Sequence, residues 1–451
     1  MTTTSSQIYA PIPSLPGLPL LGNVLALRKK RLELLLHISH TFGDIGAFHF
    51  GPKLVPVLNS PELVRQVLVD QSASFEKTAT VRALATPVLG NSVFLSEGEE
   101  HRHQRRLLAP LFQHSRILQY AEIMADCAER LQATWQDGTT INLADEMTRL
   151  TLWIISKVLF DADVSGEEHE LGEVLTYTFR HFASAMTNPL RLPQSWPTPQ
   201  NRRARQAIAQ INAAIYRMIE ERRRSSEDRS DLLSSLLHAQ DDEHASSLSN
   251  QQARNEILSL FVAGHETTAT ALTWCWYLLS QHPEIYARMR EEGDTVLAGR
   301  LPTVADLPNL PYTLQVFKET LRLYPPVYAF TRGATAPVHL SEYLIPKGTS
   351  VVISPYTLHR RSKFFPDPER FDPERFDPQQ EQKLVRYSFI PFGAGSHTCL
   401  GMHFALLEGH LLLATLAQRL TFEFAGSGPV EPEPLLTLRP KGKIPMRVRR
   451  R

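Results

Sequence analysis

The chain has 451 residues, and 42% of them are hydrophobic, which is enough to build a large core. Its 48 basic and 47 acidic residues nearly cancel, and this balance argues against a nucleic-acid-binding protein, which would carry a strongly basic domain. The three cysteines, Cys127, Cys275 and Cys399, lie far apart and are odd in number, so they argue against a disulfide framework and fit a reducing compartment.

Residues 1–30 form a proline-rich N-terminal segment in which we find no secretory signal and no membrane anchor. The apolar run from Pro11 to Leu27 is too short to span a bilayer, and no stretch of about 20 apolar residues occurs elsewhere. We therefore expect no membrane span and a cytoplasmic location. Length alone suggests roughly two to four domains, but no convincing linker interrupts the chain, so we expect one domain over residues 1–451.

Strand-like patterns are few in this chain. The runs Ile45–Phe50 and Val55–Leu58 flank a short turn and predict a hairpin. Further strands are expected at Val351–Ser354 and in the tail from Leu435. Most of the remaining sequence alternates helical patterns with short turns, so the predicted fold class is mainly α with small β-sheets.

One predicted helix is much longer than the others. Ser249 and Gln252 have the spacing of a capping box, and a mostly apolar pattern then runs to about Gln281, where His282-Pro283 ends it. A helix of that length spans roughly 45 Å at 1.5 Å per residue. A helix so long and so apolar must cross the core.

The middle of this helix carries residues suited to proton transfer. Gly264 and Thr267 are three positions apart and share a face. The Thr267 hydroxyl can donate and accept hydrogen bonds, and the Glu266 carboxyl can carry a proton. The alternative for Thr267 is a hydrogen bond back to a carbonyl of its own helix.

Two further segments have strong local signals. Glu319 and Arg322 are three apart on a helix and can pair, and Tyr324-Pro325-Pro326 ends that helix. Cys399 lies at the end of the glycine-bearing run Phe392–Gly401, just before an apolar helix. A helix N-terminus and nearby backbone N–H groups stabilise a thiolate, which is the metal-binding form of cysteine. The alternative, a cysteine that only packs in the core, does not explain ten patterned residues.

Taken in order, these segments resemble the cytochrome P450 family, in its soluble bacterial form. The resemblance covers nearly the whole chain, from the proline-rich start Pro16–Asn23 to the cysteine loop, and the order and spacing of the motifs agree. It implies the cytochrome P450 fold, a large helical domain with a minor β-rich part, that holds heme b (iron protoporphyrin IX) with Cys399 as the axial ligand. The implied activity is monooxygenation, the insertion of one oxygen atom from O2 into a hydrophobic molecule such as a fatty acid or terpenoid.

The resemblance also assigns the residues around the heme. Its propionates would be bound by His101, Arg105, Arg332 and His397, although a surface role for either histidine is the alternative. Gly264 would remove bulk beside the ring, where the planar ligand lies. Thr267 would donate to dioxygen and accept from water, and Glu266 would draw protons inward from solvent. His265 would point away from the oxygen pocket, so we do not expect it to bind the metal.

A structural network is implied for Glu319 and Arg322. In the family such a pair locks onto an arginine in a Pro-Glu-Arg-Phe run, and this chain has two copies of that run, Pro368–Phe371 and Pro373–Phe376. The spacing to the cysteine favours Arg375 of the second copy. The network would support the loop that presents Cys399.

Substrate contacts are expected from three apolar segments, with core packing as the alternative at each position. The residues are Arg82, Leu84, Phe261, Ala263, Tyr328 and Phe330. Electrons would come from a separate ferredoxin or flavodoxin-type donor with its NAD(P)H reductase. Arg102, in a locally basic helix, could dock such an acidic partner or remain a solvated charge.

Two rival functions remain open from the sequence alone. One is a related peroxygenase or isomerase that needs no reductase, and the other is a heme-thiolate sensor without turnover. Glu266 and Thr267 argue against both, because neither function needs an acid–alcohol relay.

Overall fold

The computed structural model describes residues 9–161, 196–225, 231–238 and 248–451. Contacts within the chain gather into two compact units, each of which is discontinuous in sequence. The strand-rich unit comprises Met1–Arg82, Val327–Arg370 and Lys383–Cys399, and the helical unit comprises Ala83–Pro326, Phe371–Gln382 and Leu400–Arg451. The single domain over residues 1–451 remains a prediction.

The strand-rich unit is built on a five-stranded sheet with the order β1-β2-β8-β5-β3. Only the β2–β8 pair is parallel among these neighbours. The predicted hairpin is confirmed, with Ile45 of β1 paired to Leu58 of β2 and Phe50 paired to Lys53. The strands are β1 (Ile45–Phe50), β2 (Lys53–Leu58), β3 (Phe75–Glu76), β5 (Phe330–Ala334) and β8 (Ser350–Ile353), and a second small sheet pairs β6 (Val338–Leu340) with β7 (Tyr343–Ile345).

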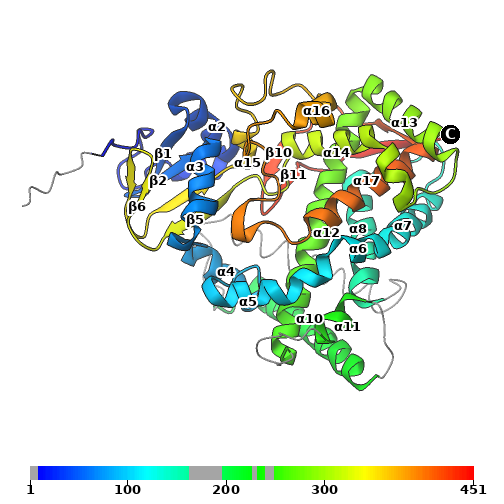
Figure 1. Cartoon of the computed structure of the whole chain (residues 1–451), viewed down its shortest axis with the longest axis horizontal. Helices are drawn as coiled ribbons and strands as arrows, with labels where there is room; N and C mark the ends of the chain where they lie inside the picture. The colour runs from blue at the N-terminus through cyan, green and yellow to red at the C-terminus, as the bar shows by residue number, and fades with distance from the viewer. Residues whose placement is uncertain (1–8, 162–195, 226–230, 239–247) are drawn as a thin grey trace, which may run out of the picture. The chain divides into compact units, whose positions relative to one another are not determined.

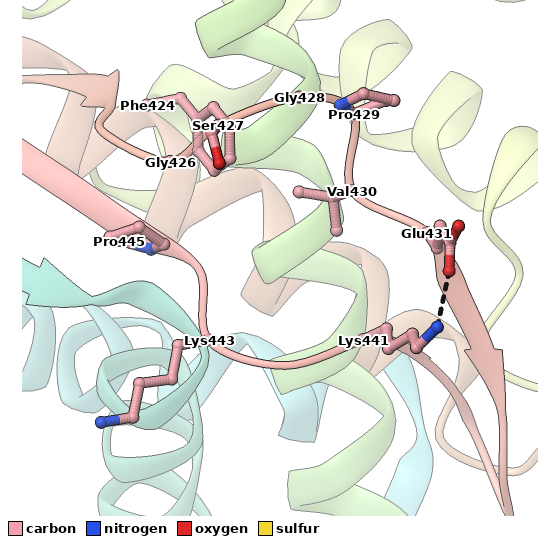
Figure 2. A pocket seen from close by; sticks show the side chains of 10 residues that line it. All are labelled: Phe424, Gly426, Ser427, Gly428, Pro429, Val430, Glu431, Lys441, Lys443 and Pro445. Carbon is pink, nitrogen blue, oxygen red and sulfur yellow. Dashed lines mark hydrogen bonds and ion pairs between the residues drawn. The ribbon is translucent and has the colours of Figure 1, made fainter.

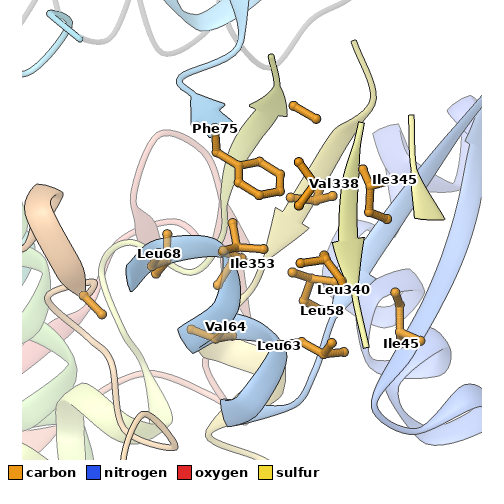
Figure 3. Close-up of a cluster of buried hydrophobic side chains, with 14 of the residues drawn as sticks. Ile45, Leu58, Leu63, Val64, Leu68, Phe75, Val338, Leu340, Ile345 and Ile353 are labelled. Carbon is orange, nitrogen blue, oxygen red and sulfur yellow. The ribbon is translucent and has the colours of Figure 1, made fainter. Parts of the chain in front are cut away.

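Buried aliphatic side chains hold this sheet to the neighbouring short helices. Figure 3 shows part of this core, in which Leu58 and Ile353 of the sheet lie near Leu63 and Val64 of α3. A second cluster packs Leu35 of α2 against the sheet. The helices of the unit are α1 (Val24–Lys29), α2 (Arg31–Phe42), α3 (Pro61–Arg65), the π-helix η1 (Gln66–Asp70), the 3-10 helix η2 (Ser72–Ser74), α15 (Pro355–Leu358) and the 3-10 helix η7 (Gly395–His397), and α4 (Ala79–Leu89) runs from this unit into the helical one.

The helical unit surrounds α12 (Asn250–Gln281), which packs against α8 (Leu143–Phe160), α14 (Pro311–Leu323) and α17 (Met402–Arg419) (Figure 1). Both hydrogen bonds of the predicted capping box form between Ser249 and Gln252, and His282 ends the helix as expected. Trp274 of α12 is fully buried, stacks on Tyr324 with ring centroids 3.8 Å apart, and donates its indole N–H to the Leu438 carbonyl at 2.7 Å.

The remaining elements of the helical unit are mostly short. They are α5 (Gly98–Leu108), η3 (Ala109–Phe112), α6 (His114–Ile117), η4 (Leu118–Tyr120), α7 (Ala121–Ala133), α10 (Pro199–Arg224), α11 (Leu232–His238), α13 (Pro283–Leu297), η5 (Val304–Asn309), η6 (Pro373–Phe376) and α16 (Pro378–Glu381). Two small sheets have the orders β4-β12-β9 and β10-β11, formed by β4 (Thr140–Asn142), β9 (Leu420–Phe424), β10 (Pro432–Pro434), β11 (Leu438–Pro440) and β12 (Pro445–Arg450).

The predicted fold class, mainly α with small sheets, is confirmed. In the part of the chain that the structure describes, no helix is both long enough and apolar enough to cross a bilayer. Several of the strands that sequence patterns did not predict, such as β3 and β6, have only two or three residues, which is too few to establish an alternating pattern.

Candidate active site

Cys399 lies in a tightly hydrogen-bonded loop at the end of the strand-rich unit. Its backbone N–H donates to the Phe392 carbonyl at 2.9 Å, and the Thr398 hydroxyl donates to the Gly395 carbonyl at 2.7 Å. Cys399 is exposed, whereas Cys127 and Cys275 are buried. Burial raises the pKa of the Cys275 thiol to about 12. Of the three cysteines, Cys399 alone is accessible to a ligand.

Gly395 is required in this loop for two separate reasons. Its φ of +72° lies in the left-handed region, and a Cβ placed on it would fall 1.9 Å from the Leu68 carbonyl oxygen of η1. A residue with a side chain would therefore be strained at this position and would also overlap the neighbouring backbone. The close approach to the π-helical turn adds a contact that the sequence did not indicate, and it fixes the loop against η1.

Three cationic or basic side chains converge in the strand-rich unit. Phe75 and Glu76 of β3 pair with Ala334 and Gly333 of β5, so the next position in this register places Lys77 opposite Arg332. The Lys77 ammonium nitrogen also lies 3.2 Å from Nδ1 of His397. This cluster of Lys77, Arg332 and His397 suits an anion. Sequence reasoning found Arg332 and His397 but missed Lys77.

The other two predicted anion-binding residues lie on α5 of the helical unit. His101 and Arg105 are one turn apart on the same face of this helix. His101 is only 3% exposed, so the alternative of a surface histidine is wrong for this residue. Arg102 is exposed and pairs with Glu99 at 2.8 Å, which offsets part of the basic charge expected there.

One stripe along the middle of α12 is left uncovered. Leu260, Ala263, Gly264 and Thr267 all retain exposure, although many of the surrounding residues of this helix are buried. Their spacing is that of a single helical face. The Thr267 hydroxyl donates to the Ala263 carbonyl at 2.8 Å. The alternative stated for Thr267, a hydrogen bond back to a carbonyl of its own helix, is therefore present in this structure.

The prediction that the missing side chain of Gly264 makes room for a planar ligand is wrong about where this space lies. A Cβ at Gly264 would lie 2.8 Å from Cδ1 of Ile155, so the absent side chain lets α8 pack closely on α12. Thr151 of α8 also donates its hydroxyl to the His265 carbonyl at 3.0 Å. Spacing along α12 could not reveal this neighbour, and Ala263 is the small residue with the greater exposure.

Glu266 is buried and held by two partners that the sequence reasoning missed. One carboxylate oxygen accepts from the Thr437 hydroxyl at 2.7 Å and lies 2.8 Å from the Arg439 guanidinium. His265, next to it, has its Nδ1 3.1 Å from the Phe261 carbonyl, and burial lowers the pKa of the His265 imidazole. The Nδ1 atom of His265 is therefore directed to its own helix.

A second buried acid lies beside the same segment. Glu408 of α17 is 1% exposed and interacts with the Thr268 hydroxyl, and burial raises the pKa of its carboxyl to about 8. In the part of the chain that is described, its Oε2 has no hydrogen-bond partner. Its sequence position gave no hint, because a glutamate in an apolar helix is normally assigned to the exposed face.

The predicted network around Glu319 is present and identifies its second arginine. Glu319 and Arg322 are fully buried and form two hydrogen bonds of 2.7 and 2.8 Å, while the Asp372 backbone N–H donates to Glu319 at 2.9 Å. Arg375 lies 3.5 Å from the same carboxylate. In the earlier copy of the run, Glu369 instead pairs with Arg360 at 3.0 Å. Arg375 is thus the arginine of the second copy that lies beside this carboxylate, and its role in supporting the cysteine loop stays a prediction.

The predicted substrate-contact residues fall into three groups. Ala263 is exposed and Leu84 and Phe330 are half-buried, so all three can still contact a ligand. Phe261 and Tyr328 differ from the prediction, because both are buried within protein. Phe261 packs beside the Phe160 ring at 6.3 Å between centroids, and the Tyr328 hydroxyl accepts from Arg31 at 2.7 Å. Arg82 pairs with Glu76 at 3.2 Å, so the carboxylate that it binds is the protein's own.

A surface hollow of about 470 Å³ lies elsewhere on the helical unit (Figure 2). It is formed by the loop before β10 and the loop before β12, and Glu431 and Lys441 pair across its edge at 2.7 Å. None of its lining residues is among the predicted site residues. The hollow therefore shares no residue with the candidate active site.

Comparison with known proteins agrees with the motifs. The family model for cytochrome P450 matches residues 12–446. Cyclooctatin synthase of Streptomyces melanosporofaciens is 38% identical and covers 94% of this chain and 92% of its own, and pentalenene oxygenase of Streptomyces avermitilis is 33% identical and covers 94% of each. Cyclooctat-9-en-7-ol 5-monooxygenase of the first organism is 37% identical over 90% of this chain and 88% of its own. The crystal structure of the cytochrome P450DA heme domain superimposes with a TM-score of 0.90 at 26% identity, covering 98% of each chain.

Proposed function

Because this chain belongs to the cytochrome P450 family and is a heme-dependent monooxygenase of hydrophobic molecules, we propose that Cys399 is its axial ligand and that its substrate is a terpenoid. The observation that carries the ligand assignment is the exposed thiol of Cys399 at the end of a hydrogen-bonded loop, while the other two cysteines are buried. The substrate class rests on the relatives.

The residues present fit a thiolate-ligated heme on two independent observations. In the strand-rich unit, an accessible sulfur and the cluster of Lys77, Arg332 and His397 offer one soft ligand and cations suited to carboxylates. In the helical unit, α12 leaves an uncovered face around Ala263 and Thr267. Arg105 and the buried His101 would add further donors to the propionates.

When bound, the heme supplies the oxidising chemistry, and the chain supplies the ligand, the binding pocket and the protons. We propose that the Thr267 hydroxyl rotates away from the Ala263 carbonyl and then donates its proton in the pocket. Glu266 would take up a proton from solvent and pass it to the Thr267 hydroxyl. Its attachment to Thr437 and Arg439 keeps the carboxylate at one place on α12 between transfers.

The terpenoid proposal is supported by the names of the bacterial relatives. One is named for cyclooctatin, one for cyclooctat-9-en-7-ol and one for pentalenene, and each covers most of this chain. For the electron donor we propose a ferredoxin or flavodoxin-type protein with its NAD(P)H reductase. Exposed arginines of α5 support a docking surface for such an acidic protein.

The ligand assignment is tested by spectroscopy of the reduced protein with carbon monoxide. The red-shifted band typical of a thiolate-bound heme should form in the wild type and disappear in Cys399→Ala. Cys127→Ala is the matched control and should keep the band. Loss of the band in the control with retention in Cys399→Ala would overturn the assignment.

The substrate class is tested separately by the spin-state shift of the heme on ligand binding. Pentalenene and cyclooctat-9-en-7-ol should shift the spectrum, and product analysis with a reconstituted electron donor should then show addition of one oxygen atom. Medium-chain fatty acids serve as the comparison. A shift and turnover with the fatty acids alone would contradict the terpenoid proposal and leave the ligand assignment intact.

A further inference from the structure

Large apolar side chains gather at one exposed corner of the strand-rich unit. Leu18, Leu20, Leu21, Leu25 and Phe50, here called the leucine corner, are between 43% and 92% exposed. They make up half of the exposed large apolar residues in the described part of the chain. Scattered exposed leucines are normal, but a group of five is a feature of interaction sites.

Backbone hydrogen bonds hold the leucine corner together as one surface. Leu18 and Gly22 exchange two bonds of 2.9 and 2.7 Å, which closes a tight turn around Leu20. The Gly51 N–H donates to the Leu21 carbonyl at 3.3 Å, and Gly22 bridges to Phe50. The turn therefore lies against the tip of the β1–β2 hairpin, and Leu20, Leu21 and Phe50 are neighbours in space.

Leu20 is the least expected residue of this group. Its φ of +63° lies in the left-handed region, which is costly for any residue with a branched side chain, and the side chain is 92% exposed. Glycine or asparagine would suit the turn better, and no packing within the protein rewards a leucine at this position. Backbone strain at an exposed apolar residue therefore indicates that Leu20 contacts another molecule.

Cations border the leucine corner. Arg28 and Lys29 follow Leu25 by three and four positions on α1, so they share its side of the helix, and Lys53 stands directly opposite Phe50 in the hairpin. All three are exposed, and within the described residues none of them forms an ion pair. Between positions 9 and 60 the sequence has five basic residues and two acidic ones.

We propose that the leucine corner docks onto the surface of an anionic lipid bilayer. Apolar side chains that enter the boundary between headgroups and acyl chains, together with cations placed at the phosphates, are the two attractions that hold a peripheral protein on a membrane. A second copy of the chain is the less suitable occupant, because a two-fold contact would bring Arg28, Lys29 and Lys53 of both copies together. This inference does not depend on the proposed substrate.

The test is co-sedimentation of the heme-loaded full chain with vesicles. Wild type should sediment with vesicles that contain phosphatidylglycerol, and much less with phosphatidylcholine alone. Leu20→Ser with Leu21→Ser and Phe50→Ser should lower the partition coefficient at least tenfold. Val385→Ser, which changes a 50% exposed valine elsewhere in the same unit, should bind like wild type.

A second variant separates the contribution of the cations to binding from that of the apolar side chains. Its carbon monoxide band shows whether the variant is still folded. Arg28→Gln with Lys29→Gln and Lys53→Gln should remove the preference for phosphatidylglycerol while the carbon monoxide band persists. The proposal is overturned if wild type sediments with neither vesicle or equally with both. It is also overturned if the serine variant binds as wild type does, or if the serine substitutions abolish a dimer in ultracentrifugation and leave vesicle binding unchanged.

Discussion

The environment of Glu408 differs strongly from that of an ordinary carboxyl. It lies inside the helical unit with a pKa of about 8, compared with a value of 4.5 for a free glutamate. The folded protein therefore favours the protonated acid, while the unfolded chain ionises in weakly acidic solution. Between the two pKa values, folding is coupled to proton uptake at this position.

The first prediction concerns the pH dependence of stability. Glu408 does not oppose folding below pH 4.5, and its destabilising effect grows as pH rises towards about 8, where it levels off. Glu408→Gln should remove this effect and be more stable than wild type at pH 8 by a few kcal/mol, since each unit of pKa is worth ~1.4 kcal/mol. Urea unfolding at pH 5 and pH 8 measures the difference.

The control for this experiment is Glu122→Gln, which changes an exposed acid on α7. Its difference from wild type should be the same at both pH values to within about 0.5 kcal/mol, as expected for a surface substitution. A Glu408→Gln protein whose advantage is equal at pH 5 and pH 8 would show that the carboxyl ionises normally.

The second prediction concerns the Thr267 hydroxyl. Thr267→Ala should fold and bind heme normally, because its one recorded hydrogen bond is to a carbonyl of its own helix. Coupling of NAD(P)H oxidation to product should fall at least about tenfold, the lower range for loss of a proton-transfer group, with peroxide released instead. Product and peroxide yields per NAD(P)H measure it.

Thr273→Ala is the matched control for Thr267→Ala. Thr273 is a buried threonine of α12 that donates to the Ala269 carbonyl at 2.7 Å in the same manner. Because it lies outside the uncovered stripe, its removal should leave coupling unchanged. Equal coupling in all three proteins would remove Thr267 from the proton route.

At the scale of elements, the buried Glu319–Arg322 pair joins α14 to the segment before η6. The two side chains are fully buried, and the carboxylate also receives the Asp372 N–H. A buried pair of this kind contributes little over apolar residues, yet the loss of one partner leaves the other charge uncompensated.

The third prediction uses the duplicated Pro-Glu-Arg-Phe run. Glu319→Ala should destabilise the protein by about 3–5 kcal/mol, because it strands Arg322 in the interior. Arg375→Ala should cost less, since this guanidinium is partly exposed and lies farther away. Arg370→Ala, the equivalent change in the first copy, should cost no more than about 0.5 kcal/mol. Denaturant unfolding ranks the three variants, and an Arg370→Ala cost that exceeds that of Arg375→Ala would contradict the assignment.

The fourth prediction compares two glycines of the cysteine loop. Gly393 and Gly395 both have positive φ, but a Cβ at Gly393 would meet nothing closer than 3.8 Å, whereas one at Gly395 would overlap the Leu68 carbonyl. Gly393→Ala should therefore cost about 1–2 kcal/mol from backbone strain alone. Gly395→Ala should displace the loop and greatly reduce the fraction of protein with the thiolate band. Equal spectra for the two variants would contradict a contact between the loop and η1.

At the scale of the whole molecule, sequence reasoning succeeded where the signal is local. The bounds of α12 follow from a capping box and a terminal proline, and the β1–β2 hairpin follows from two runs around a turn. Both of these features depend on residues close together in the chain. Arg375 lies far along the chain from Glu319, and its selection depends instead on the family's motif and on its spacing to the cysteine.

Sequence reasoning failed where a partner is distant in the chain. Arg439 lies 173 positions from Glu266, and no pattern along α12 indicates which element will meet that carboxylate. Lys77 follows a strand of only two residues, and its place opposite Arg332 depends on sheet register. The space left by the missing side chain of Gly264 faces Ile155, and not a ligand. Helical spacing predicts which residues share a face, but it does not predict which element packs on that face.

The unequal accessibility of the three sulfur atoms has a practical consequence for anyone who purifies this enzyme. Cys127 and Cys275 are buried, and the high pKa of Cys275 keeps it a poor nucleophile, so a maleimide dye should alkylate a folded chain only at Cys399. A sulfur that is bound to iron is shielded from the same reagent. The dye incorporated per chain would then count the molecules that never acquired their prosthetic group.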